Sequence, residues 1–170
     1  LWLAVAMRAN YPELALEVLR SPSPQARTGA VRAIARWNSK ADPIDKMSLL
    51  AQAVEDPHRR VRLEAVSALR NIGTLESATI ALRALGQETD NNLAFALELT
   101  VRNLRDKWLP AMQAGKPVFD GDPSRLAYAL KEVGDPRAIT PLVAVIQKGG
   151  ITGEDLPQAV TTVSALGQSA

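Results

Sequence analysis

Apolar residues between positions 56 and 73 recur at the spacing of an amphipathic helix. One stripe follows the i, i+4, i+7, i+11 rule, and two neighbouring residues widen it. The stripe consists of Val61, Ala65, Ala68 and Ile72, with Val66 and Leu69 beside them. Asp56 can cap the start of this helix, Pro57 suits its first position, and Gly73 suits the residue just past its end. The pattern predicts a helix with one buried face and one polar face.

The same pattern recurs along the chain. A shift of 35 residues places "SPSPQARTGAVRAIARW" (residues 21–37) on this segment, with shorter apolar segments between the copies. The last leucine or isoleucine of each stripe recurs at intervals of 35, 35, 26 and 36, at Ile34, Leu69, Leu104, Leu130 and Leu166. Each unit, read as two antiparallel helices, is too small to bury its own apolar face and has to stack on neighbours. We therefore expect an all-α solenoid (an α-α superhelix) of about four to five helix pairs in one domain over residues 1–170.

The short third interval predicts one irregular repeat at about residues 105–125. Residues that break long helices gather there: Pro110, Gly115, Pro117, Gly121 and Pro123. A long irregular insertion in a regular array tends to face a partner. The alternative is that the segment only closes one short repeat. Trp108 falls near a helix end, as Trp2 and Trp37 do, and packing between repeats explains all three best.

The Asp-Pro turn and the helix in "DPHRRVRLEAVSALRNIG" (residues 56–73) resemble the HEAT repeat. The resemblance is closest over residues 45–73, and "GDPRAITPLVAVIQ" (residues 134–147) resembles the first helix of another unit. It covers most of the chain and implies an armadillo-like α-solenoid. It says little about function, because such repeats serve many unrelated proteins as scaffolds.

In HEAT repeats, the turn aspartate and an arginine of the second helix often form a ladder between successive units. Carried over by position, the resemblance implies an inter-repeat ladder of Arg27, Asp56 and Arg62. The aspartate position holds Ser21 in the earlier copy and Asn91 in the later one, where Leu97 replaces the arginine. The ladder is therefore expected to be interrupted.

Residues 93–136 also resemble the HEAT region of large multidomain bacterial proteins described as membrane-bound dehydrogenases. In those proteins a propeller-type dehydrogenase and a cytochrome c module flank the helical repeats. The resemblance implies that this segment is a spacer or docking part of a longer chain, with the redox chemistry elsewhere. It also implies a periplasmic or membrane-associated protein; without that parent, a cytoplasmic location is the alternative.

Composition limits the chemistry that this segment can perform. The absence of cysteine rules out disulfides, thiolate metal sites and attached c-type haem here, and the single histidine, His58, rules out metal sites built from several histidines. No apolar run approaches the roughly 20 residues that span a bilayer. We expect no catalytic, cofactor or metal site in this segment and no membrane insertion by it. The chain begins "LWLAVAMRAN" without an initiator methionine, and we expect it to be part of a longer protein.

Arg59, Arg60 and Arg62 lie in the first turn of a predicted helix, where the helix dipole disfavours cations. We favour a structural interpretation, in which Arg62 reaches an acidic turn residue and the other two lie in solvent. The alternative is an anion or phosphate bound at the free N–H groups of the helix start.

A second set of arginines falls at similar register on the polar side of three second helices: Arg32, Arg36, Arg70, Arg102 and Arg105. In HEAT proteins this side is generally concave, so the set is a candidate basic ridge for a protein partner or a neighbouring domain. We do not expect nucleic acid to be the partner, because the net charge is only +2 and no aromatic residue is interleaved to stack bases. We expect a non-catalytic scaffold for protein or interdomain contacts. Binding of nucleic acid or another polyanion through the ridge is the alternative, and solubility is the plainest role for these arginines.

Overall fold

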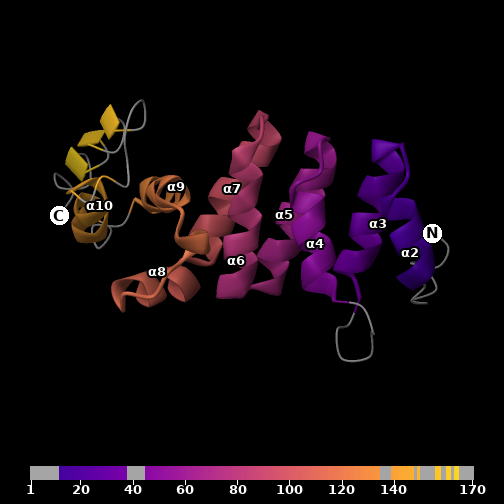
Figure 1. The fold of residues 1–170 in the computed structure, drawn as a ribbon, viewed down its shortest axis with the longest axis horizontal. Helices are drawn as coiled ribbons and strands as arrows, with labels where there is room; N and C mark the ends of the chain where they lie inside the picture. Colours follow the sequence, from indigo (N-terminus) through magenta and orange to yellow (C-terminus); the bar gives the residue numbers. More distant parts are fainter. Residues whose placement is uncertain are drawn as a thin grey trace.

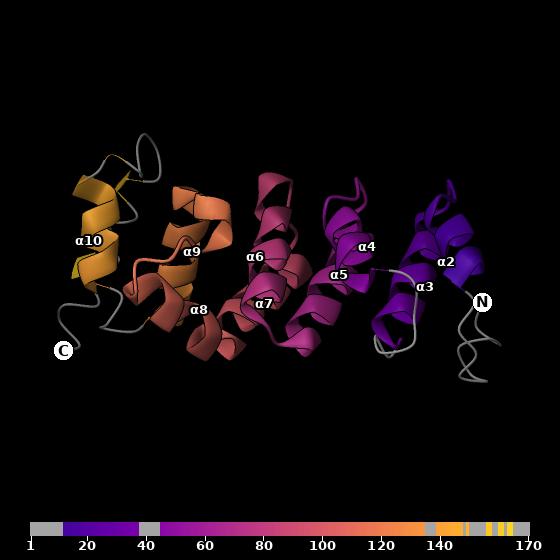
Figure 2. The same ribbon diagram turned by 60° about the horizontal axis from the view of Figure 1, so that its bottom comes forward.

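The computed structural model describes most of the chain as a row of short helices. The residues described are 12–37, 45–134, 139–147, 149, 156–157, 160–161 and 163–164. The helices follow one another in chain order from α2 at one end to α10 at the other (Figures 1 and 2). The chain is therefore an elongated stack in which each layer touches the layers next to it.

The helices alternate between two sets, as the sequence predicts. The first helices of successive repeats are α2 (Pro12–Leu19), α4 (Lys46–Val54), α6 (Leu75–Ala81) and α8 (Arg105–Gln113). The second helices are α3 (Pro24–Ala35), α5 (Arg59–Ile72), α7 (Asn91–Asn103) and α9 (Pro123–Val133). The 3₁₀ helix η1 (Leu82–Gly86) continues α6, η2 (Phe119–Gly121) precedes α9, and α10 (Ile139–Gln147) contacts α9.

The second helices form the spine of the stack. Helix α3 packs on α5, α5 on α7 and α7 on α9, and each first helix covers this row from one side. Ile34, Leu69, Leu104 and Leu130 are all buried, and Leu166 lies outside the described residues. Equivalent apolar residues thus fill successive layers of one continuous core, and the predicted all-α solenoid is confirmed.

Helix α5 starts two residues later than its sequence suggests. The cap is His58, whose Nδ1 accepts a hydrogen bond from the Arg60 N–H at 3.3 Å, whereas Asp56 accepts one from the His58 N–H at 2.8 Å. Asp56 therefore shapes the turn instead of capping the helix. At the other end, Gly73 has φ +77°, a left-handed conformation in which glycine avoids the strain that a side chain would bring.

Residues 105–125 are more regular than their prolines and glycines predict. Helix α8 runs through Pro110 to Gln113, so the predicted break at Pro110 is wrong. Proline removes one hydrogen bond, to the carbonyl of Asp106, and both residues are exposed, so water can satisfy that carbonyl. The irregular part is limited to residues 114–122.

This irregular segment closes the short repeat against the core. Phe119 and Trp108 are fully buried with ring centroids 5.3 Å apart, and the Trp108 Nε1–H donates to the Val101 carbonyl at 2.9 Å. The Phe119 N–H faces the Thr79 hydroxyl at 3.4 Å, which ties η2 to α6. Of the two sequence-based interpretations, the structure favours closure of a short repeat over a loop that faces a partner.

Candidate interaction surface

Arg27 and Asp56 join two successive repeats. The Arg27 Nε and Nη2 atoms donate to the two carboxylate oxygens of Asp56 at 2.7 and 2.9 Å, and Nη1 donates to the Ser21 carbonyl at 3.0 Å. Burial alone would raise the pKa of Asp56, but the hydrogen bonds from Arg27 and from the His58 N–H together hold it below its usual value. One rung of the implied ladder is thus an arginine fork on a carboxylate, a strong and directional geometry.

Arg62 reaches the next repeat through neutral oxygens. The side chain is buried, with only 2% of the residue exposed. Its Nη1 donates to the Asp56 carbonyl at 2.7 Å and to Gln87 Oε1 at 2.9 Å, and Nη2 donates to the Glu88 carbonyl. Arg62 thus reaches the acidic turn residue Asp56 through its backbone carbonyl and not through its carboxylate. The acceptors of the Arg62 guanidinium are the side-chain amide oxygen of Gln87 and the backbone carbonyls of Asp56 and Glu88. Gln87 and Glu88 belong to the segment after η1.

The turn carboxylate of the third repeat is Asp90, one residue before the position that the alignment selects. Asp90 caps α7 by accepting from the Leu93 N–H at 2.9 Å, and it also pairs with Arg59 at 3.2 Å. Arg59 is 62% exposed, as expected for a residue in solvent, and its acidic partner is Asp90. The ladder continues into the third repeat in an altered form.

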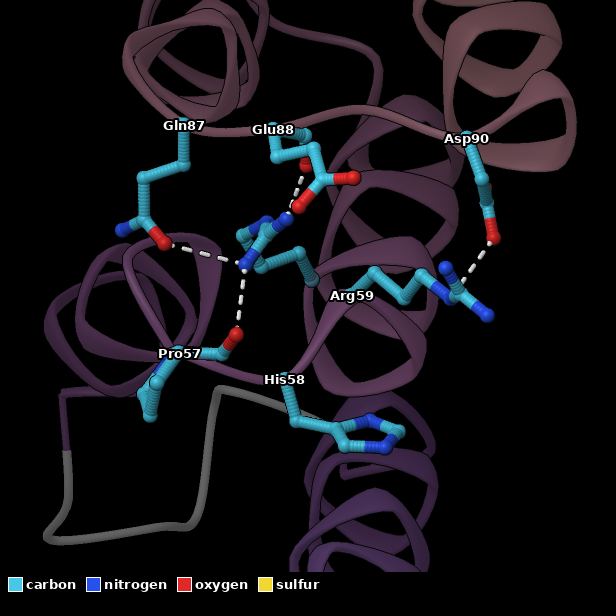
Figure 3. Close-up of a pocket in the computed structure, with 7 residues that line it drawn as sticks. Pro57, His58, Arg59, Gln87, Glu88 and Asp90 are labelled. Atoms are coloured by element: carbon cyan, nitrogen blue, oxygen red, sulfur yellow. Dashed lines mark hydrogen bonds and ion pairs between the residues drawn. The ribbon is translucent and has the colours of Figure 1, made fainter.

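A polar cavity of about 300 Å³ lies between the start of α5 and the segment before α7. Gln87 and Glu88 lie on one side and Pro57 and His58 on the other, and Arg59 points at Asp90 (Figure 3). Two carboxylates line this cavity, and the donors of Arg62 are largely occupied by neutral oxygens. These features oppose an anion, so the geometry favours the structural interpretation of the three arginines.

The predicted ridge arginines divide into paired and unpaired groups. Arg32 pairs with Glu64 of the neighbouring second helix, and Arg102 pairs with Glu98 at 3.0 Å while its Nε donates to the Glu132 carbonyl at 2.8 Å. Arg105 begins α8 instead of lying on a second helix, and it pairs with Asp106. Over the described ranges, the guanidinium groups of Arg36 and Arg70 have no hydrogen-bond or ion-pair partner. The five arginines therefore do not form one continuous basic ridge.

Phe95 is the most exposed large apolar residue in the described part of the chain. Its exposed fraction is 58%, and it lies on α7 with the half-buried Leu99 one turn later. The 35-residue shift places it at the position of Arg60 in the preceding repeat, which is a polar position. The expectation that no aromatic is interleaved with the arginines is therefore wrong. An aromatic residue on the polar stripe is the signal that could have identified it.

Tyr128 on α9 contacts the same part of α7. Its hydroxyl lies 3.5 Å from the Ala94 carbonyl, at the limit of a hydrogen bond. Burial raises the pKa of this phenol, the carboxylates of Glu132 and Glu98 raise it further, and Arg102 opposes them. The phenol is therefore a neutral donor, and it helps to hold α9 against the helix that carries Phe95.

Neither metal binding nor membrane spanning finds support in the described geometry. Among the residues described, no three or more histidine, cysteine, aspartate or glutamate side chains are placed to hold a metal ion. No helix in the described ranges combines the length and the apolar character that crossing a bilayer requires. Over the described residues, the surface offers ion pairs and the exposed aromatic ring of Phe95.

Comparison with protein families agrees with this architecture. A family model described as HEAT repeats matches residues 12–100, just over half of the chain. A second model, described as the PBS lyase HEAT-like repeat, matches residues 124–148. No curated protein matches the chain.

Proposed function

Because the chain belongs to the HEAT-repeat family, we propose that it is a non-catalytic scaffold whose second helices contact a protein partner or a neighbouring domain. HEAT repeats generally mediate protein interactions, and families built from them are typically non-catalytic. The contact surface in this proposal is termed the second-helix face. It consists of the solvent-facing residues of α3, α5, α7 and α9, among them Arg32, Arg36, Arg60, Glu64, Arg70, Phe95, Leu99, Arg102 and Tyr128.

The exposure of Phe95 is the observation that carries this proposal. The core beneath it is complete, since Leu93, Leu97 and Val101 of the same helix are fully buried. At 58% exposure, Phe95 leaves much of its apolar surface in water, which is unfavourable unless a partner covers it. Aromatic residues surrounded by polar groups often form the centre of protein interfaces.

The charge pattern supports a protein partner over nucleic acid. Arg32 and Arg102 are already neutralised by Glu64 and Glu98, so the basic ridge is interrupted by carboxylates. A phosphate backbone would meet repulsion at those positions, and nucleic-acid footprints usually show uninterrupted basic surface. Binding of nucleic acid or another polyanion through the ridge arginines is the less supported alternative.

A neighbouring domain of the same chain is one form that this partner can take. The resemblance of residues 93–136 to the HEAT region of bacterial membrane-bound dehydrogenases supports this form, because α8, α9 and most of α7 lie within that segment. In such a parent the dehydrogenase and cytochrome domains would hold the cofactors, and this segment would position them.

Photo-crosslinking at position 95 tests the proposal. Phe95 is replaced by a photoreactive phenylalanine analogue in the protein expressed in its own cells, and Gln52, an exposed residue of α4, is replaced in the same way as a control. We expect adducts from position 95 that map to one protein or to another domain of the same chain, and few from position 52. Equal crosslinking at the two positions, or none at position 95, would refute the proposal.

A further inference from the structure

The second helices carry a charge opposite to that of the rest of the chain. Residues 24–36, 59–72 and 91–103, which are α3, α5 and α7 with one flanking residue, contain eight arginines and two glutamates but no lysine or aspartate. Their formal charge is +6, eight minus two. The whole chain carries +2, so the remaining residues carry −4. The small net charge thus hides a strong separation between these three second helices and the remaining residues.

The two glutamates within this row are already occupied. Glu64 holds Arg32, and Glu98 holds Arg102. At the turn edge, Arg27 and Arg59 are held by Asp56 and Asp90, which lie outside the row, and Arg62 is buried among carbonyl oxygens.

Three arginines of the row have no partner among the residues that the structure describes. Over the described ranges, the guanidinium groups of Arg36, Arg60 and Arg70 have no hydrogen-bond or ion-pair acceptor. Arg60 lies one turn before Glu64 on the exposed stripe of α5, Arg70 lies near the end of that helix, and Arg36 follows the neighbouring α3. The positive charge of these three arginines therefore lies on α5 and at the end of the adjacent α3.

Phe95 lies beside this charge, not apart from it. Helices α5 and α7 pack against each other, and the 35-residue register places Phe95 and Arg60 at equivalent positions of the two helices. An exposed aromatic ring and a guanidinium without a partner among the described residues therefore lie in the N-terminal halves of two helices that pack against each other. A partner that covers the ring also comes within reach of the guanidinium.

From these observations, and resting on the proposed function above, we infer that the second-helix face binds an acidic protein segment that also carries an apolar side chain. The apolar side chain covers Phe95 and Leu99, and carboxylates of the segment pair with Arg60, Arg36 and Arg70. Arginine suits this role because its planar guanidinium binds a carboxylate through two parallel hydrogen bonds. Along α5, Arg60 and Arg70 are separated by about 15 Å at 1.5 Å per residue, so a segment of roughly ten helical residues can reach both.

A peptide selection tests this chemistry directly. A library of random twelve-residue peptides is selected against the chain, and the recovered peptides are labelled with fluorescein for binding measured by anisotropy. The charge-reversal variant Arg36→Glu, Arg60→Glu, Arg70→Glu is compared with a matched control, Arg20→Glu, Lys107→Glu, Lys116→Glu. The control changes the net charge equally at three exposed positions away from the second-helix face. Thermal unfolding of both variants checks that each is folded.

The inference predicts peptides rich in aspartate and glutamate with at least one large apolar residue. We expect the face variant to weaken their binding about tenfold or more and the control to weaken it by less than about twofold. Neutral or basic peptides, an equal loss in both variants, or no recovered peptide would overturn the inference. Tighter binding of a 20-base-pair DNA duplex that only the face variant abolishes would overturn it in favour of nucleic acid.

This outcome is separable from that of the proposed function. If position 95 crosslinks to a protein but the selected peptides are not acidic, the interface stands and its charge chemistry is wrong. If position 95 does not crosslink, the proposed function fails and the inference fails with it.

Discussion

Arg27 and Asp56, 29 residues apart in the sequence, form a two-pronged ion pair that joins α3 to the turn before α5. Both side chains are mostly buried, with 15% and 11% of their surfaces exposed. Asp56→Asn should lower the free energy of unfolding by about 2 to 3 kcal/mol, because it removes a charged acceptor from a largely desolvated arginine. Urea unfolding measures this. Asp106 pairs with Arg105, but its side chain is 82% exposed. Asp106→Asn should therefore change the free energy of unfolding by less than about 0.5 kcal/mol.

Stability should fall with acidification, because the pKa values of Asp56 and Asp120 are held low. The hydrogen bond from Arg83 is the main cause for Asp120, and the bonds from Arg27 and His58 outweigh burial for Asp56. A carboxylate with a lower pKa when folded contributes stability above its unfolded pKa of about 4, and this is lost as the pH falls through its folded pKa. Urea midpoints between pH 6 and pH 2 should fall less steeply for Asp56→Asn than for the unmodified chain. Parallel curves would contradict this assignment.

Arg62 and Arg59 stand in the first turn of one helix but should differ in importance. Arg62→Met should destabilise the chain by about 2 to 4 kcal/mol, because the carbonyls of Asp56 and Glu88 lose a buried donor. Arg59→Met should cost less than about 1 kcal/mol, since 62% of that side chain is exposed. Equal losses in thermal or urea unfolding would show that the bonds to residues 87 and 88 do not hold the repeats together.

Phe119 and Phe95, the two phenylalanines of the chain, should respond in opposite ways to truncation. Phe119→Ala should cost about 3 to 5 kcal/mol, because it opens a cavity beside Trp108. Phe95→Ala should change the free energy of unfolding by less than about 0.5 kcal/mol, as most exposed substitutions do. A large loss from Phe95→Ala would mean that this ring serves the fold and is not free for a partner.

The repeating core could be predicted from the sequence because a solenoid repeats its buried positions at a fixed interval. Ile34, Leu69, Leu104 and Leu130 illustrate this, since all four are buried in one continuous core. The contact of Arg27 with Asp56 follows from the resemblance to HEAT repeats and not from the period, because the aspartate position holds Ser21 and Asn91 in the neighbouring copies. Periodicity alone yields the architecture.

Features that depart from the period could not be predicted. Phe119 and Asp120 have φ of +54° and +59°, a conformation that nothing in their residue types suggests. Asp120 is held there by pairs with Arg83 at 2.9 Å and Arg125 at 2.7 Å, and these contacts exist only once the chain has folded. The hydrogen bond from Arg62 to Gln87 could not be predicted either, because Gln87 lies in a connection whose length differs between repeats.

Footprinting of Phe95 by hydroxyl radicals tests the central claim most directly, because it reports whether the second-helix face is covered in the working protein. Oxidation of Phe95 in the isolated chain is compared with oxidation in the native assembly, with exposed His58 and buried Trp108 as internal references. We predict rapid oxidation of Phe95 in the isolated chain, several-fold protection in the assembly, and little change at His58. Equal oxidation of Phe95 in the two states would contradict the account.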